Sequence, residues 1–218
     1  MRQVTVTTTT LMPRRLRLSA ASRRRQLLDV ALETFARSGL DATTMDDIAR
    51  EAGVTKPLLY QHFKSKRALF LELLDEVVVR IIQAVTDAAE STLEPRRQVE
   101  AVCSGYFRFV FHNESAIRLL LDSTLPYDPE LADAIRRVDD TIAIAVRPLI
   151  RADIEPDHQR MLAAAVVGMS KGVTRDWLHT KADAAAPSSL EQLDDEAELL
   201  ARRVAEFAWT GLRMVHRD

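Results

Sequence analysis

The stretch that decides the fold is residues 44–69, TMDDIAREAGVTKPLLYQHFKSKRAL, which contains three helix starts. Thr44 followed by Asp47 resembles a capping box, in which each of the two side chains accepts a hydrogen bond from the other residue's backbone N–H. The apolar residues that follow have helical spacing, and Gly53 can adopt the positive φ that ends a helix. The pattern therefore predicts a short helix between Thr44 and Gly53.

A second short helix is predicted from Lys56 to Phe63. Thr55 precedes it as the N-cap, and Pro57 suits its first turn because the N–H groups there have no partner within the helix. Two short helices joined by a turn that contains glycine are typical of a helix-turn-helix, whose second helix lies in the major groove of DNA. Ser65 then caps a third, much longer helix, in which every fourth residue from Leu69 to Val85 is apolar.

The residues in and before this stretch resemble the signature of the TetR/AcrR family of bacterial regulators. The matching positions keep the family's spacing between residues 24 and 70: Arg24, Leu27, Leu28, Ala31, Phe35, Gly39, Thr43, Thr44, Ile48, Ala49, Ala52, Gly53, Val54, Tyr60, Phe63, Lys66 and Leu69. Two positions depart from the family pattern. Leu40 replaces the usual aromatic residue after Gly39, and Pro57 with Leu58 stands at the start of the presumed reading helix. The resemblance implies an all-α fold of about nine helices, with a three-helix DNA-binding domain and a C-terminal bundle for ligand binding and dimerisation.

Charge is distributed unevenly along the 218 residues. The net charge is −2, yet residues 1–67 contain 13 Arg and Lys against 6 Asp and Glu, and the remainder contains 17 against 26. A basic region that coincides with a helix-turn-helix indicates a nucleic-acid-binding face. We therefore expect a disordered basic arm over 1–21, a DNA-binding domain over 22–68, and a ligand-binding and dimerisation domain over 69–218.

Composition excludes several other classes of protein. Hydrophobic residues make up 47% of the chain and there are only six glycines, which favours a folded helical protein. Cys103 has no second cysteine to pair with, which fits a reducing cytoplasm. No apolar stretch approaches the ~20 residues that span a bilayer, and the five histidines lack metal-ligand spacing. We expect a cytoplasmic protein with no membrane association, no metal and no cofactor.

The remaining helices follow from proline, serine and aspartate starts and from apolar spacing. The first helix is predicted from Ser22 to Ser38 and ends at Gly39. Later helices are predicted at 95–112, 114–122, 129–147 (capped by Asp128), 156–180 and 190–214, with a turn at Leu125–Tyr127 and a loop over 181–188. Ser188 with Glu191, or Ser189 with Gln192, forms a capping box for the last of these helices.

Three groups of candidate site residues follow. The resemblance places DNA contacts at Thr44, Thr55, Lys56, Tyr60, His62 and Lys66. Arg25, one of three successive arginines at the start of the first helix, is added to this set. The predicted ligand pocket is lined by Val78, Ile81, Phe107, Phe111, Leu120, Leu121, Met169 and Trp177. The last helix carries two apolar strips, one of which needs a partner outside the subunit. Together with two glycines of the helix before it, this strip gives the predicted homodimer interface: Gly168, Gly172, Leu200, Val204, Phe207 and Gly211.

The resemblance implies a repressor that binds a palindromic DNA operator as a dimer. The apolar pocket predicts a small lipophilic effector, such as a fatty acid or an acyl thioester, that releases the DNA. No residue is assigned a catalytic role. Two alternative functions are a helical hydrolase and a lipid-binding carrier.

Gly168–Gly172, GMSKG, matches the G-x-S-x-G pattern of hydrolases, which would make Ser170 a nucleophile. That chemistry needs a strand followed by a sharp turn, whereas the flanking residues are predicted helix, so the glycines are interpreted as a close-packing site. A lipid-binding carrier without DNA binding is the second alternative, and it leaves the basic region unexplained.

Overall fold

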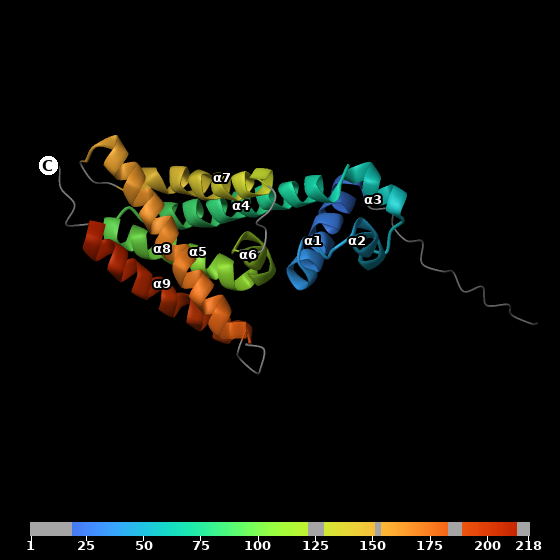
Figure 1. Cartoon of the computed structure of the whole chain (residues 1–218). Helices are drawn as coiled ribbons and strands as arrows, with labels where there is room; N and C mark the ends of the chain where they lie inside the picture. Colours follow the sequence, from blue (N-terminus) through green and yellow to red (C-terminus); the bar gives the residue numbers. More distant parts are fainter. Residues whose placement is uncertain (1–18, 122–128, 151–153, 183–188, 213–218) are drawn as a thin grey trace, which may run out of the picture.

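The computed structural model describes residues 19–121, 129–150, 154–182 and 189–212, and within those ranges all regular structure is helical. Figure 1 shows a small module, α1–α3, at one end of the molecule and a bundle, α5–α9, at the other, with α4 running through both. The proposed arm up to residue 18, the Leu125–Tyr127 turn, the Asp128 cap, Ser188 and the end of the last predicted helix lie outside the described residues.

The first helix, α1, spans Ala20–Ser38. It begins two residues earlier than predicted, because the Ser19 hydroxyl accepts a hydrogen bond from the Ser22 N–H at 3.1 Å. Residues 20 and 21 therefore belong to the helix and not to a disordered arm. Gly39 ends α1 with φ of 79°, as predicted from its sequence position.

The helix-turn-helix consists of α2, Met45–Glu51, and α3, Lys56–His62. The capping box at the start of α2 is confirmed: Thr44 Oγ1 accepts from the Asp47 N–H at 3.1 Å, and Asp47 Oδ2 accepts from the Thr44 N–H at 3.0 Å. Gly53 has the predicted positive φ, 63°. Thr55 occupies the N-cap position of α3, but its side chain makes no capping hydrogen bond, so the predicted Thr55 cap is correct in position only.

The long helix α4 spans Lys66–Glu90 and is capped by Ser65, whose hydroxyl accepts from the Ala68 N–H at 3.1 Å. The predicted apolar row is buried along its whole length: Leu69, Leu73, Val77, Ile81 and Val85. One end of α4 contacts α1, and the rest packs on α5 and α7. The same helix is therefore part of both the module and the bundle.

The bundle contains α5 (Pro95–His112), α6 (Glu114–Leu121), α7 (Pro129–Val146) with the 3-10 turn η1 (Arg147–Leu149), α8 (Pro156–Ala182) and α9 (Leu190–Leu212). Helix α8 runs two residues beyond its predicted end. Of the two predicted capping boxes for α9, the pair Ser189 and Gln192 is present, with both hydrogen bonds formed. Helix α9 packs on α5, α7 lies along α4 and α8, and α6 contacts α1.

Helix α5 lies close to α4 at Gly105. A Cβ added there would lie 2.7 Å from the carbonyl oxygen of Ala84 and 2.9 Å from the Cβ of Ala88. Glycine is therefore required at this position by space rather than by backbone conformation. Within the described residues, no helix combines the length and the apolarity needed to cross a membrane.

Candidate nucleic-acid interface and apolar cavity

Helix α3 has one buried side and one exposed side. Leu59 on the helix and Phe63 directly after it are almost fully buried in the module core. Thr55, Lys56 and Tyr60 are exposed, and Figure 1 shows α3 at the end of the molecule away from the bundle. A short helix held by its apolar side, with hydroxyl and ammonium groups facing outward, has the form of a DNA-reading helix.

Arg24 of α1 holds α3 and α4 together. Its guanidinium forms two hydrogen bonds with the Glu72 carboxylate, one of them at 2.6 Å from Nε, and Nη1 donates to the His62 carbonyl oxygen at 2.6 Å. The same group lies over the Phe63 ring, 4.4 Å from its centroid. Arg24 thus fixes the angle between the reading helix and α4, and its donors are directed inward.

Lys66 has a structural task that the sequence interpretation missed. Its ammonium donates to the carbonyl oxygens of Leu40, Asp41 and Thr43, at 2.7, 3.2 and 2.8 Å. An ammonium has three N–H donors, so these three carbonyls occupy all of them. Lys66 therefore ties the start of α4 to the loop between α1 and α2, and its role as a DNA contact stays a prediction.

Two other predicted contacts already have hydrogen-bond partners. The Lys56 ammonium lies 2.8 Å from Asp46 Oδ1, and this carboxylate raises the pKa of Lys56. The Thr44 hydroxyl donates to Asp47 Oδ2 at 2.6 Å as part of the capping box. Both residues are exposed on the surface. A phosphate could replace Asp46 at Lys56 at little cost, because exposed ion pairs contribute about 1 kcal/mol or less.

Arg25 is exposed near the start of α1, while His62 is half-buried at the end of α3 with its ring 6.3 Å from that of Phe63. The predicted DNA contacts Thr55, Lys56, Tyr60 and His62 are thus brought together on α3. Thr44, Arg25 and Lys66 belong to three other elements. Exposed Lys64, directly after α3, is a further cation on this module.

An apolar cavity of about 60 Å³ lies inside the bundle between α4, α5, α6, α7 and α8 and is partly open to solvent. Its apolar lining includes Ile81, Val85, Ile117, Leu120, Val138 and Ile142. Four polar or charged residues also line it: Tyr106, Asp139, Ser170 and Lys171. Such a cavity can bind a ligand that is largely apolar and has one polar group.

The predicted pocket coincides with this cavity only in part. Ile81, Leu120 and Leu121 line it. Val78, Phe107, Phe111, Met169 and Trp177 do not; they pack against or within the hydrophobic core. Phe111 and Trp177 stack with their ring centroids 3.9 Å apart, and the Trp177 Nε1–H donates to Glu196 at 3.3 Å, so this aromatic pair fastens α5, α8 and α9 to one another.

The two charged residues of the cavity, Asp139 and Lys171, were not among the predicted pocket residues. Asp139 lies four residues after Ile135 on α7, and Lys171 lies four residues after Val167 on α8. Each therefore shares a helical face with an apolar lining residue. A charged residue at an apolar position of a helical repeat is the signal that could have found them.

The buried thiol and phenol beside the cavity are chemically quiet. Burial raises the pKa of the Cys103 thiol to about 12, and burial likewise raises the pKa of Tyr106 to about 12. Neither side chain is ionised at neutral pH, so neither provides a nucleophile. Among the described residues, no group of three or more His, Cys, Asp or Glu could hold a metal ion.

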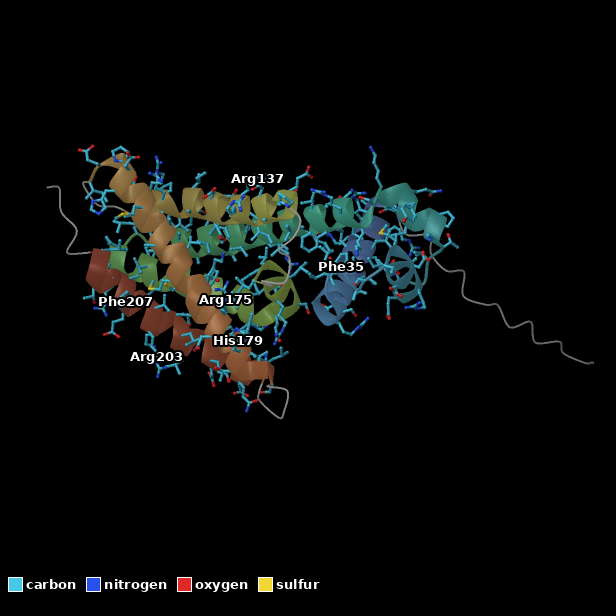
Figure 2. All side chains as sticks on the ribbon, viewed as in Figure 1. Phe35, Arg137, Arg175, His179, Arg203 and Phe207 are labelled. Carbon is cyan, nitrogen blue, oxygen red and sulfur yellow. The ribbon has the colours of Figure 1, made fainter. Side chains whose placement is uncertain are left out.

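The predicted dimer residues fall on both sides of α8 and α9. Gly168, Gly172 and Gly211 are exposed, and a Cβ built at any of them meets no atom of the protomer within 4 Å. Phe207 is 73% exposed, and Figure 2 shows it with Arg203 on α9, at the edge of the bundle away from α4.

Val204, by contrast, is buried within its own subunit and Leu200 is half-buried against the core. Val204 is therefore removed from the predicted interface, because the strip of α9 that packs on the subunit's own core passes through it.

The G-x-S-x-G match lies in the middle of α8, with helix on both sides of Ser170. A nucleophile elbow requires a strained turn between a strand and a helix, which is absent here. The two glycines lie on the exposed side of α8 instead.

Comparison with known proteins gives consistent results. Residues 27–73 match the family of bacterial regulatory proteins, tetR family. The HTH-type transcriptional activator FasR of Mycolicibacterium smegmatis is 33% identical over 201 residues, which cover 91% of this chain and 87% of FasR. The HTH-type transcriptional repressor KstR2 of Mycobacterium tuberculosis is 34% identical over 101 residues, which cover 46% of this chain and 50% of KstR2.

A similar fold occurs in the transcriptional regulator FadR of Bacillus subtilis, whose crystal structure contains stearoyl-CoA. The TM-score is 0.71 at 16% identity, over 86% of this chain and 98% of FadR. The relatives are transcriptional regulators and not enzymes, so the hydrolase alternative is excluded. With its helix-turn-helix, its all-helical bundle and a match to FasR over nearly its whole length, this chain belongs to the TetR/AcrR family of bacterial transcriptional regulators.

Proposed function

We propose that this regulator binds a palindromic operator as a homodimer in the cytoplasm, and that a small lipophilic ligand in the bundle cavity releases it from DNA. In this proposal residues 19–68 form the DNA-binding domain and 69–218 the ligand-binding and dimerisation domain. The observation that carries the proposal is helix α3, which buries Leu59 and exposes Thr55, Lys56 and Tyr60.

The exposed groups of α3 divide into two kinds of DNA contact. Thr55 and Lys56 lie at the helix N-terminus, from which side chains in a major groove reach base edges. The Tyr60 hydroxyl and Arg25 suit phosphate oxygens, with His62 at the rim. Thr44, at the N-terminus of α2, suits a contact with the DNA backbone. Lys66 is left out of this set, since its three donors are occupied by backbone carbonyls.

The dimer is proposed to form through the outer faces of α8 and α9. Gly168 and Gly172 allow close approach of a second helix, and exposed Phe207 and Gly211 continue the same kind of surface on α9. A phenylalanine ring that is 73% exposed gains about 1.5–3 kcal/mol when it is fully buried. Two-fold symmetry doubles that gain and matches a palindromic operator.

The ligand is proposed to act through its preference for one arrangement of the dimer. A ligand releases DNA only if it binds the DNA-incompatible arrangement more tightly than the compatible one. The cavity touches α4 at Ile81 and Val85, so occupation of the cavity bears directly on the helix that reaches the DNA-binding module. The apolar lining supports a fatty acid or an acyl thioester, and FadR, of similar fold, holds stearoyl-CoA.

Two directions of control have support. The repressor expected from the sequence agrees with KstR2, whereas FasR, which matches nearly the whole chain, is an activator. For repression and for activation alike, the proposed ligand controls how long the operator is occupied. Whether binding represses or activates transcription then depends on whether the operator overlaps the promoter or lies upstream of it. Footprinting and a promoter–reporter fusion with and without the regulator would decide between the two.

The test is binding of the purified protein to the DNA upstream of its own gene as salt is varied. Lys56→Ala and Tyr60→Phe should each weaken binding, and Arg25→Ala, which removes a proposed cationic phosphate contact, should lower the magnitude of the slope of log K against log salt by about 1. Arg96→Ala is the matched control, because it removes one exposed cation from the start of α5, far from α3. Equal effects of Arg96→Ala and Lys56→Ala would refute the proposed interface.

A further inference from the structure

An ion pair lies at the border of the apolar cavity, and the proposed function does not use it. Lys171 Nζ on α8 is 2.5 Å from Asp139 Oδ2 on α7, and both residues line the cavity. The two side chains are 25% and 37% exposed, so the pair has apolar lining on one side and solvent on the other. The ammonium can therefore be reached by a ligand that lies in the cavity.

The other polar groups of the cavity are neutral. Thr174 donates its hydroxyl hydrogen to the Ser170 carbonyl oxygen at 2.8 Å, so the Tyr106 hydroxyl, 3.1 Å away, is the donor to Thr174 Oγ1. Tyr106 thus has its one hydrogen committed and carries no charge at neutral pH. Lys171 has three N–H donors, and among the described residues the hydrogen bond that it forms goes to Asp139. Lys171 is the cation that faces the cavity.

This inference rests on the proposed lipophilic ligand and identifies the head group that the cavity recognises. We propose that Lys171 binds the carboxylate of a long-chain fatty acid, and that Asp139 competes with that carboxylate for the same ammonium. The alkyl chain lies against Ile81, Leu120 and Ile142. A carboxylate without a partner is costly in an apolar site, and a charged hydrogen bond to Lys171 removes most of that cost.

Asp139 weakens the preference of the site for an acid, because its carboxylate competes with the ligand carboxylate for the Lys171 ammonium. Its side chain is exposed enough to turn to solvent when a ligand carboxylate takes its place. A ligand with a neutral head group gains no ion pair in return for displacing Asp139, so it leaves the pair intact and binds through its chain alone. Lys171 therefore favours an acid over a neutral lipid with the same chain, and Asp139 limits the size of that preference.

The test compares hexadecanoic acid with hexadecanol, which share one chain and differ in the charge of the head group. Isothermal titration of the full-length protein should show that Lys171→Met weakens binding of the acid about tenfold and changes binding of the alcohol by less than about twofold. Asp139→Asn should tighten the acid about threefold to tenfold, because the competing charge is removed. Lys171→Arg, which keeps the charge, should retain the preference for the acid.

The outcomes separate this assignment from the proposed function. If the acid and the alcohol respond alike to Lys171→Met and Asp139→Asn, the pair is only a brace between α7 and α8, and the assignment is overturned. If hexadecanoyl coenzyme A binds both wild type and Lys171→Met while the acid does not bind, the lipophilic ligand stands and the carboxylate site falls. Failure of all three compounds to bind the folded protein would overturn both. Thermal melting of every variant identifies any that do not fold. If Lys171→Met does not fold, the affinity of Asp139→Asn for the acid and for the alcohol decides whether the assignment holds.

Discussion

Replacing Gly105 with alanine tests the close contact between α4 and α5 at this position. Alanine is favoured over glycine in a helix interior by about 1 kcal/mol. Here, however, the new Cβ would lie 2.7 Å from the Ala84 carbonyl oxygen and 2.9 Å from the Ala88 Cβ. A backbone oxygen cannot move without moving α4, so we take the upper end of the usual overpacking cost, ~3 kcal/mol. The expected net loss is about 2 kcal/mol, which for a chain of this size lowers Tm by about 4–8 °C.

The assay is differential scanning calorimetry at one fixed protein concentration. Gly168→Ala is the matched control, because the same substitution in α8 meets no atom of the protomer within 4 Å. Because Gly168 is also part of the proposed dimer interface, this control is compared with wild type at a protein concentration at which both are monomeric. There it should raise Tm by about 2–4 °C through helix propensity. The dimer content of each variant is measured at the same concentration, since loss of dimer would itself lower Tm. A Tm for Gly105→Ala equal to or above that of wild type would refute the reasoning.

Three further predictions follow from the local geometry. Lys66→Met should lower the free energy of unfolding in urea by about 2 kcal/mol, because three carbonyls lose a charged donor; unchanged stability with lost DNA binding would instead restore Lys66 as a phosphate contact. The pKa of Asp47 is lowered to about 2 by the Thr44 hydroxyl, the Thr44 N–H and Arg50. The stability that Asp47 contributes is therefore present above its ordinary value of 3.8 and is lost as pH falls through 2. An NMR titration of its carboxyl group should have a midpoint near 2 that rises in Thr44→Val, and a wild-type midpoint near 3.8 would contradict the capping argument. Phe207→Glu should dissociate the dimer in sedimentation experiments whereas Leu93→Glu, at an even more exposed apolar residue, should not; equal behaviour would exclude α9 from the interface.

The starts and ends of most helices could be predicted to within two residues because the signals are local. Thr44, Ser65 and Pro95 act within one helical turn, and Gly39 and Gly53 are needed for positive φ. These signals do not depend on how helices cross. The family signature adds the helix-turn-helix, so the fold and the position of the reading helix were available from the sequence.

The details of the sites depend on helix crossings that no local signal records. Phe111 lies on the inner face of α5, as expected, yet the crossing of α8 stacks Trp177 on its ring and leaves no space there. Val204 has the spacing of an interface residue, but the angle between α9 and α5 turns it toward the core. Lys66 matches the family signature, yet the path of the loop after Gly39 gives its ammonium three carbonyl partners.

The length of α4 turns a small displacement at the cavity into a large one at the DNA. Its 25 residues extend for about 37 Å at 1.5 Å per residue. Tilting such a lever by about 5° about one end sweeps the other end through about 3 Å. Because Arg24 links the His62 carbonyl of α3 to Glu72 of α4, the reading helix would move together with α4. In the proposed dimer both α4 helices would tilt, and two reading helices set for grooves ~34 Å apart would move apart or together by several ångströms.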